Sequence, residues 1–116
     1  MAIPLTSMEQ VLPFPTAGEL IARKHEPVLS VPPPTTLLAA LQLMADKHVG
    51  FLPVIENGAL AGVVSERDCA RRVVLRQLAA ANTAVREIMT TQVHSVPPQS
   101  KITECIMLMH DKDIRH

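Results

Sequence analysis

Residues 28–47, VLSVPPPTTLLAALQLMADK, decide the fold, because they return at residues 93–112 as VHSVPPQSKITECIMLMHDK. The two copies align without a gap and share the blocks Ser-Val-Pro-Pro and Leu-Met-x-Asp-Lys. Apolar residues replace one another between the blocks, as Leu37 and Ile102 do. Chance matching of apolar residues would not keep these blocks in register. The chain therefore contains an internal repeat.

The first copy and the residues after it predict alternating strands and helices. A β-branched run ended by prolines predicts a short strand at 28–31. Thr35 or Thr36 is expected to cap a helix, since the apolar residues that follow have helical spacing, and Gly50 is expected to end it. Strands are predicted at 51–55 and 60–64 around an Asn-Gly turn at 57–58, followed by a helix from Ser65 to about residue 78.

Composition excludes several classes of protein. The chain has 116 residues, of which 47% are hydrophobic and 2% aromatic, and its formal net charge is zero. This much apolar surface excludes intrinsic disorder. No apolar run is long enough to span a membrane, and the N-terminus lacks the basic region of a secretion signal. The two cysteines, Cys69 and Cys105, predict buried free thiols in the cytoplasm rather than a disulfide framework.

Several motifs in order resemble those of a tandem pair of cystathionine β-synthase (CBS) domains, the Bateman module. In the first copy they are Met44 followed by Phe51-Leu-Pro-Val54, Gly58-x-Leu60-x-Gly62, and Gly62-Val-Val-Ser-Glu-Arg-Asp68. The second copy adds Glu87-Ile-Met-Thr90 and Ile114-Arg-His116. The run that starts at Ser65 is most similar to small stand-alone bacterial CBS proteins.

The resemblance implies an α/β (α+β) fold of β-α-β-β-α repeats, with one complete copy and the first β-α half of a second. The expected organisation is an irregular segment at 1–16, a complete first repeat at 17–80, and a second repeat at 81–116 that is truncated after its first helix. The truncation is expected to leave the apolar face of Ile102, Ile106 and Met109 without its normal cover.

The resemblance also implies a regulatory protein that binds an adenosine-containing ligand in the cleft between its repeats. The ligand classes are AMP, ATP, NAD and S-adenosylmethionine, and no cofactor is required. Asp68 would accept hydrogen bonds from the ribose hydroxyls, and Ser65 would contact ribose or phosphate, as suits a carboxylate and a helix N-terminus. Three arginines, Arg67, Arg71 and Arg72, would contact phosphate. Backbone from both repeats would complete the site at Gly50, Phe51, Thr90, Val93 and His94.

Other interpretations of the same residues stay open. Ser65 and Asp68 also form a variant of the capping box, which would make their role structural. The arginines between Arg67 and Arg76 also fit a solvated helix face partly paired with Glu66 and Asp68. The corresponding alternatives for the whole protein are a ligand-free dimerisation module and a nucleic-acid-binding protein that uses the arginine helix. Zero net charge and few aromatic residues count against nucleic acid.

Catalysis and metal binding receive no support from the sequence. No nucleophile elbow and no glycine-rich phosphate loop are present, so the chain is predicted not to be an enzyme. The polar residues at the end of the second copy (His110, Asp111, Asp113 and His116) predict a solvated helix end rather than metal ligands. The expected partners are a small adenosine-containing ligand and a second copy of the chain, bound through the CBS repeats.

Overall fold

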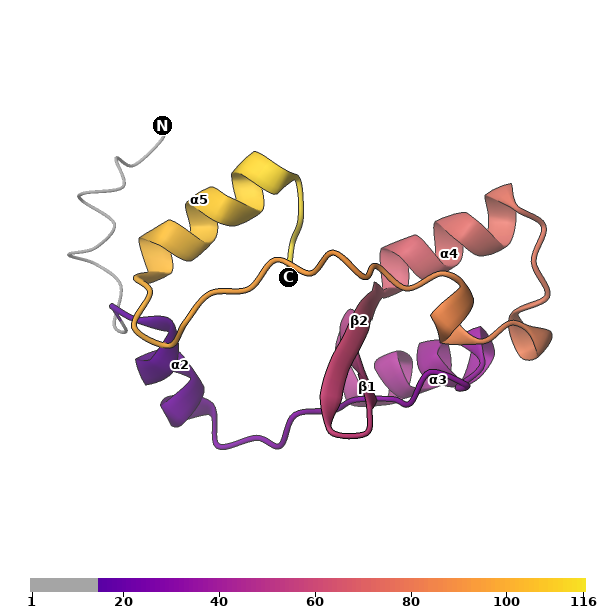
Figure 1. Ribbon diagram of the computed structural model, residues 1–116, viewed down its shortest axis with the longest axis horizontal. Coiled ribbons are helices and arrows are strands. Elements are labelled where there is room, and N and C mark those ends of the chain that lie inside the picture. Colours follow the sequence, from indigo (N-terminus) through magenta and orange to yellow (C-terminus); the bar gives the residue numbers. More distant parts are fainter. Residues whose placement is uncertain (1–14) are drawn as a thin grey trace. The chain divides into compact units, whose positions relative to one another are not determined.

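The computed structural model describes residues 15–116 (Figure 1), so most of the segment predicted to be irregular at 1–16 lies outside the described residues. The chain forms two compact units. One unit consists of residues 28–93, and the other joins residues 94–116 to the segment that precedes residue 28. Both units mix segments from the two sequence repeats, and the repeat limits at 17–80 and 81–116 stay a prediction.

The unit of residues 28–93 is built on one antiparallel hairpin. Strands β1 (Phe51–Glu56) and β2 (Ala59–Ser65) meet at Asn57 and Gly58, whose φ angles are 52° and 78°. Asparagine and glycine tolerate this left-handed backbone, which fits the twist of a two-residue hairpin. The hairpin predicted at 51–64 and the mixed α+β class are therefore confirmed.

Two helices pack on this hairpin. Helix α3 (Leu37–Lys47) contacts β1, helix α4 (Glu66–Leu75) contacts β2, and the two helices lie side by side (Figure 1). Thr36 caps α3 by accepting the N–H of Ala39 at 3.1 Å. Two short 3₁₀ turns follow α4, at Ala80–Asn82 and Val85–Glu87.

The core of this unit lies between the hairpin and the helices. Alternate strand residues point inward, and they meet the apolar face of α3 and one residue of α4. The buried apolar residues are Val31, Leu37, Ala40, Met44, Leu52, Val54, Val64, Cys69, Val85 and Ile88. Burying a side chain of the size of Leu or Met contributes about 1.5–3 kcal/mol, so this cluster holds the unit together.

The prediction of a strand at residues 28–31 is wrong. Only Val31 joins the hairpin, through one parallel bridge in which it donates to the carbonyl of Pro53 at 3.1 Å and accepts from Ile55 at 3.0 Å. Val28 is 81% exposed. Because the prolines that follow Val31 carry no N–H, the pairing cannot continue beyond it.

The predicted end of α3 at Gly50 is also wrong. The left-handed residue that ends the helix is His48, with φ 55° and ψ 41°, and its N–H group returns to the carbonyls of Met44 and Ala45. Gly50 instead directs its carbonyl to the first N–H of α4. The glycine signal is strong in general, but here a histidine occupies the strained position.

Two helices of the second unit lie within the described residues. Helix α2 (Ala17–Lys24) is capped by Thr16, and helix α5 (Ile102–Lys112) is the counterpart of α3 in the sequence repeat. No helix was predicted at 17–24. Within the described residues, Thr103 is the buried residue of α5, and the face of Ile102, Ile106 and Met109 is half-buried. None of the helices in residues 15–116 has the length and apolarity to cross a lipid bilayer.

Each unit is closed by a backbone segment that we call a strap. Strap 83–90 closes the unit of residues 28–93. The N–H of Leu37 donates to the carbonyl of Thr83 at 2.8 Å, and the N–H of Val85 donates to the carbonyl of Thr35 at 2.7 Å. A third bond runs from the N–H of Arg86 to the carbonyl of Pro33 at 3.2 Å.

Strap 15–18 makes the same three bonds in the other unit. The N–H of Ile102 donates to Pro15 at 2.9 Å, that of Ala17 to Ser100 at 2.9 Å, and that of Gly18 to Pro98 at 2.8 Å. In both units one bond satisfies the first N–H of a helix, which has no partner inside its own helix. The internal repeat therefore extends to the way in which each unit is closed.

We expect His48→Gly to raise the free energy of unfolding by about 0.5–1 kcal/mol. A left-handed backbone costs a non-glycine residue roughly 1–2 kcal/mol, and the greater entropy of glycine in the unfolded chain offsets part of the gain. Urea unfolding followed by far-UV circular dichroism measures the change. His48→Ala is the matched control, since alanine keeps the strain. An equal gain for both variants would contradict the explanation.

The two cysteines should differ in reactivity. Cys69 is fully buried, and burial raises the pKa of its thiol to about 11, with Asp68 adding to the rise and Arg72 opposing it. The thiolate is the reactive form, so at pH 8 iodoacetamide should label the half-buried Cys105 and spare Cys69. Mass spectrometry of the labelled peptides gives the result. In urea both should react; equal labelling of the native protein would show that Cys69 is accessible.

Candidate functional site

The candidate site begins where β2 becomes α4. Ser65 is the last residue of β2, and its extended backbone (φ −111°, ψ 154°) makes it the N-cap of α4. Its Oγ accepts the N–H of Asp68 at 3.1 Å. The capping interpretation of Ser65 is thus confirmed, and the cap fixes the first turn of α4 on which Arg67 and Asp68 lie.

Asp68 is half-buried and, within residues 15–116, its carboxylate oxygens accept no hydrogen bond and join no ion pair. Its charge reaches the neighbouring Cys69, whose pKa it raises. The N–H of Glu66 is bonded to Gly50 at 2.9 Å, and the N–H of Arg67 has no partner in the described part of the chain. The first turn of α4 therefore offers a ligand two acceptor oxygens, from Asp68, and one donor, the N–H of the adjacent Arg67.

Gly50 and Phe51 lie at the same place. Phe51 is the register partner of Ser65 across the hairpin, and the carbonyl of Gly50 accepts the first N–H of α4. Both residues are half-buried. The structure thus brings together four of the predicted site residues: Gly50, Phe51, Ser65 and Asp68.

Thr90 reaches the site through strap 83–90. Its N–H donates to the carbonyl of Val63 at 2.9 Å, and its carbonyl accepts the N–H of Val63 at the same distance. Val63 stands two residues before Ser65 on β2. The exposed Thr90 is therefore held close to the end of β2, and its contact with a ligand stays a prediction.

Gly62 makes this approach possible and was not among the predicted site residues. A Cβ atom on Gly62 would lie 2.7 Å from the carbonyl oxygen of Thr90 and 2.8 Å from the sulfur of Met89. Real Cβ atoms essentially never approach other atoms so closely. A glycine inside a strand often marks the close approach of another backbone, and that signal could have identified Gly62.

The arginines lie along α4. Arg67 and Arg71 are exposed, and Arg72 is half-buried and opposes part of the rise that burial causes in the pKa of Cys69. Within the described residues none of the three has a carboxylate at ion-pair distance, and the choice between a solvated helix face and phosphate contacts stays open. Val93 is the last residue of this unit, and His94 belongs to the other unit.

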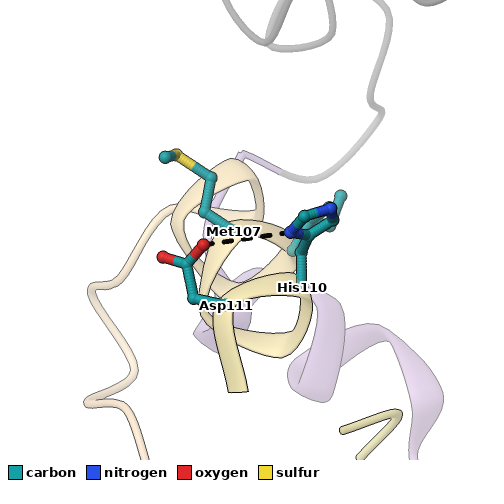
Figure 2. Close-up of a pocket in the computed structure, with 4 residues that line it drawn as sticks. Met107, His110 and Asp111 are labelled. Atoms are coloured by element: carbon teal, nitrogen blue, oxygen red, sulfur yellow. Dashed lines mark ion pairs between the residues drawn. The ribbon is translucent and has the colours of Figure 1, made fainter. Parts of the chain in front are cut away.

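A separate hollow lies on α5. Ile106, Met107, His110 and Asp111 line a volume of about 270 Å³, and His110 Nδ1 lies 3.9 Å from Asp111 Oδ1 (Figure 2). All four side chains come from one helix, so the hollow is an open surface feature. Residues 15–116 contain no group of three or more His, Cys, Asp or Glu side chains placed to hold a metal ion.

Two curated proteins resemble the chain in sequence. CBS domain-containing protein YhcV of Bacillus subtilis is 35% identical over 88 residues, which are 76% of this chain and 62% of that protein. The mitochondrial CBS domain-containing protein CBSX3 of Arabidopsis thaliana is 35% identical over 86 residues, which are 70% of this chain and 42% of that protein. The chain thus spans less than two thirds of either relative.

Solved structures agree in fold. A protein with CBS domains from Burkholderia ambifaria MC40-6 superposes with a TM-score of 0.80 at 35% identity, covering 86% of this chain and 76% of that one. The CBS domain pair of protein MJ0100, solved with 5′-methylthioadenosine and S-adenosyl-L-methionine, gives 0.74 at 16% identity, covering 88% and 77%.

The family model for the CBS domain matches residues 17–75 and 85–116, which include both copies of the repeat. CBS-domain proteins are generally regulatory and often bind ligands. The motifs that indicated this relationship form the hairpin and the capped start of α4. The internal repeat appears in the structure as the matching bonds of the two straps. The chain belongs to the CBS domain family.

Proposed function

We propose that this protein senses an adenosine-containing ligand at the first turn of α4. The observation that carries the proposal is the half-buried residue Asp68, whose carboxylate oxygens have no partner in residues 15–116, beside a helix start that Ser65 caps. Two carboxylate oxygens match the two adjacent hydroxyls of a ribose. The adenosine compounds bound by the MJ0100 domain pair support this ligand class.

The rest of the ligand would follow from the residues around Asp68. The N–H of Arg67, which has no partner in residues 15–116, and the positive end of α4 suit a phosphate, to which Arg67, Arg71 and Arg72 would add charge. The backbone at Gly50, Phe51 and Thr90 would line the adenine. AMP, ATP and NAD fit this arrangement, and S-adenosylmethionine would use the ribose contacts without the phosphate contacts.

The proposal includes the setting in which the protein works. We place it in the cytoplasm as a homodimer that regulates a partner and catalyses no reaction itself. Exposed apolar side chains on the helices of residues 28–93 support pairing between copies, since Leu38 on α3 and Val74 and Leu75 on α4 face solvent. Sensing requires that the ligand bind one arrangement of the protein better than another.

Asp68→Asn should weaken AMP binding about tenfold or more, because it removes hydrogen bonds to a charged acceptor worth about 1.5–3 kcal/mol. The melting temperature without ligand should change little, since the cap of α4 depends on Ser65 Oγ. Calorimetry with AMP, ATP, NAD and S-adenosylmethionine, beside thermal melts, measures both effects.

Glu66→Gln is the matched control, an exposed acidic residue in the same turn. It should leave AMP affinity unchanged. Equal losses of affinity and of stability in Asp68→Asn would support a purely structural role. Failure of the unaltered protein to bind any of the four compounds would favour the alternative, a ligand-free dimerisation module.

Arg71→Gln should lower ATP affinity about two- to fivefold and leave adenosine affinity unchanged, since an exposed charge contact is worth at most about 1 kcal/mol. The difference should shrink between 50 and 500 mM salt as screening increases. Equal losses for ATP and adenosine would place Arg71 away from phosphate. Salt-sensitive retention on DNA, reduced by the same variant, would favour the nucleic-acid alternative.

A further inference from the structure

We propose that Gly62 is a positioning residue for the ligand site, and that the Val63–Thr90 pair it permits couples ligand occupancy to strap 83–90. This inference rests on the proposed function, since it concerns the regulation of that same site. Gly62 would have this role without touching the ligand, because its effect comes from the absence of a side chain.

The contact is close and depends on the absence of a side chain. Thr90 and Val63 exchange two backbone hydrogen bonds of 2.9 Å, and the carbonyl oxygen of Thr90 would lie only 2.7 Å from a Cβ atom on Gly62. Met89 could move away from such an atom, because the atoms in contact, its sulfur and Cγ, belong to a flexible unbranched side chain. The carbonyl of Thr90 could move only if the strap moved.

The two ends of strap 83–90 are held differently. Its first half is anchored by three bonds to the start of α3 and by the fully buried side chain of Val85. Inside it, the carboxylate of Glu87 accepts the N–H of Ala84 at 2.7 Å. The last residue, Thr90, is exposed and is held by its two bonds to Val63. The Thr90 end is therefore the one that can open while the rest of the strap stays in place.

A ligand at the start of α4 would favour the state in which Thr90 is hydrogen-bonded to Val63. A compound that contacts both Asp68 and Thr90 makes its full set of contacts only when Thr90 is paired with Val63. Its binding energy therefore stabilises the pair, and by linkage the pair stabilises the bound ligand.

Amide hydrogen exchange of the full chain, followed by NMR with and without AMP, tests the inference. AMP should slow exchange of the Val63 and Thr90 N–H groups at least tenfold in the unaltered protein. Gly62→Ala should abolish this protection and weaken AMP binding at least tenfold, while the core amides of α3 exchange as before. Leu60→Ala, an exposed position on the same strand, is the matched control and should behave as the unaltered protein.

Two further variants separate positioning from damage to the fold. Gly62→Ala combined with Met89→Ala should not recover AMP affinity, because the clash with the Thr90 backbone remains; recovery would overturn the inference. Thr90→Pro keeps Gly62 but removes the N–H that donates to Val63, and it should lose AMP affinity to the same extent. AMP affinity equal to that of the unaltered protein in Thr90→Pro would also overturn it.

The outcome for the unaltered protein distinguishes the two proposals. If AMP binds and protects residues near Asp68 but leaves the Val63 and Thr90 amides unchanged, the inference is wrong and the proposed function stands. If AMP, ATP, NAD and S-adenosylmethionine change neither exchange nor melting temperature, the proposed function fails and the inference fails with it.

Discussion

Three backbone hydrogen bonds at the start of a helix are the constraint on which both units depend. The first N–H of α3 or α5 has no partner within its helix, and in each unit a strap supplies the missing carbonyl. In the unit of residues 28–93 the same strap buries Val85 and Ile88 against the core and then reaches β2 at Thr90. Helix start, core and candidate site are thus held by one continuous segment.

Local sequence signals were sufficient where a short-range contact determines the structure. The Asn-Gly turn predicted the hairpin, apolar spacing predicted α3, and Ser65 predicted the start of α4, which ends at Leu75 and not near residue 78. The sequence did not predict structure that depends on a contact with a distant residue or on a residue with strained backbone. Helix α2 is short and is held by bonds to Pro98 and Ser100, far along the chain, and α3 ends on a left-handed histidine instead of the nearby glycine.

The candidate site divides in the same way. Ser65, Asp68, Gly50 and Phe51 are adjacent in sequence or joined by the hairpin, so a motif and a turn were enough to bring them together. Thr90 was predicted from the family resemblance, but its pairing with Val63, and the need for glycine at position 62, depend on the path of the strap. The arginines were predicted as phosphate contacts from their positions after Ser65. Only the structure shows that, within the described residues, no carboxylate lies at ion-pair distance from them.

The straps also decide where this chain can be divided. A cut between the repeats near residue 81 would separate α3 from Thr83 and Val85, leaving an unpaired N–H at the helix start and a hole in the core. A cut before residue 28 would remove from α5 the segment that closes its own start. Neither repeat can therefore be excised at its sequence boundary as a finished domain, and a recombination event or an engineered fusion that moves one repeat must carry a piece of the other with it.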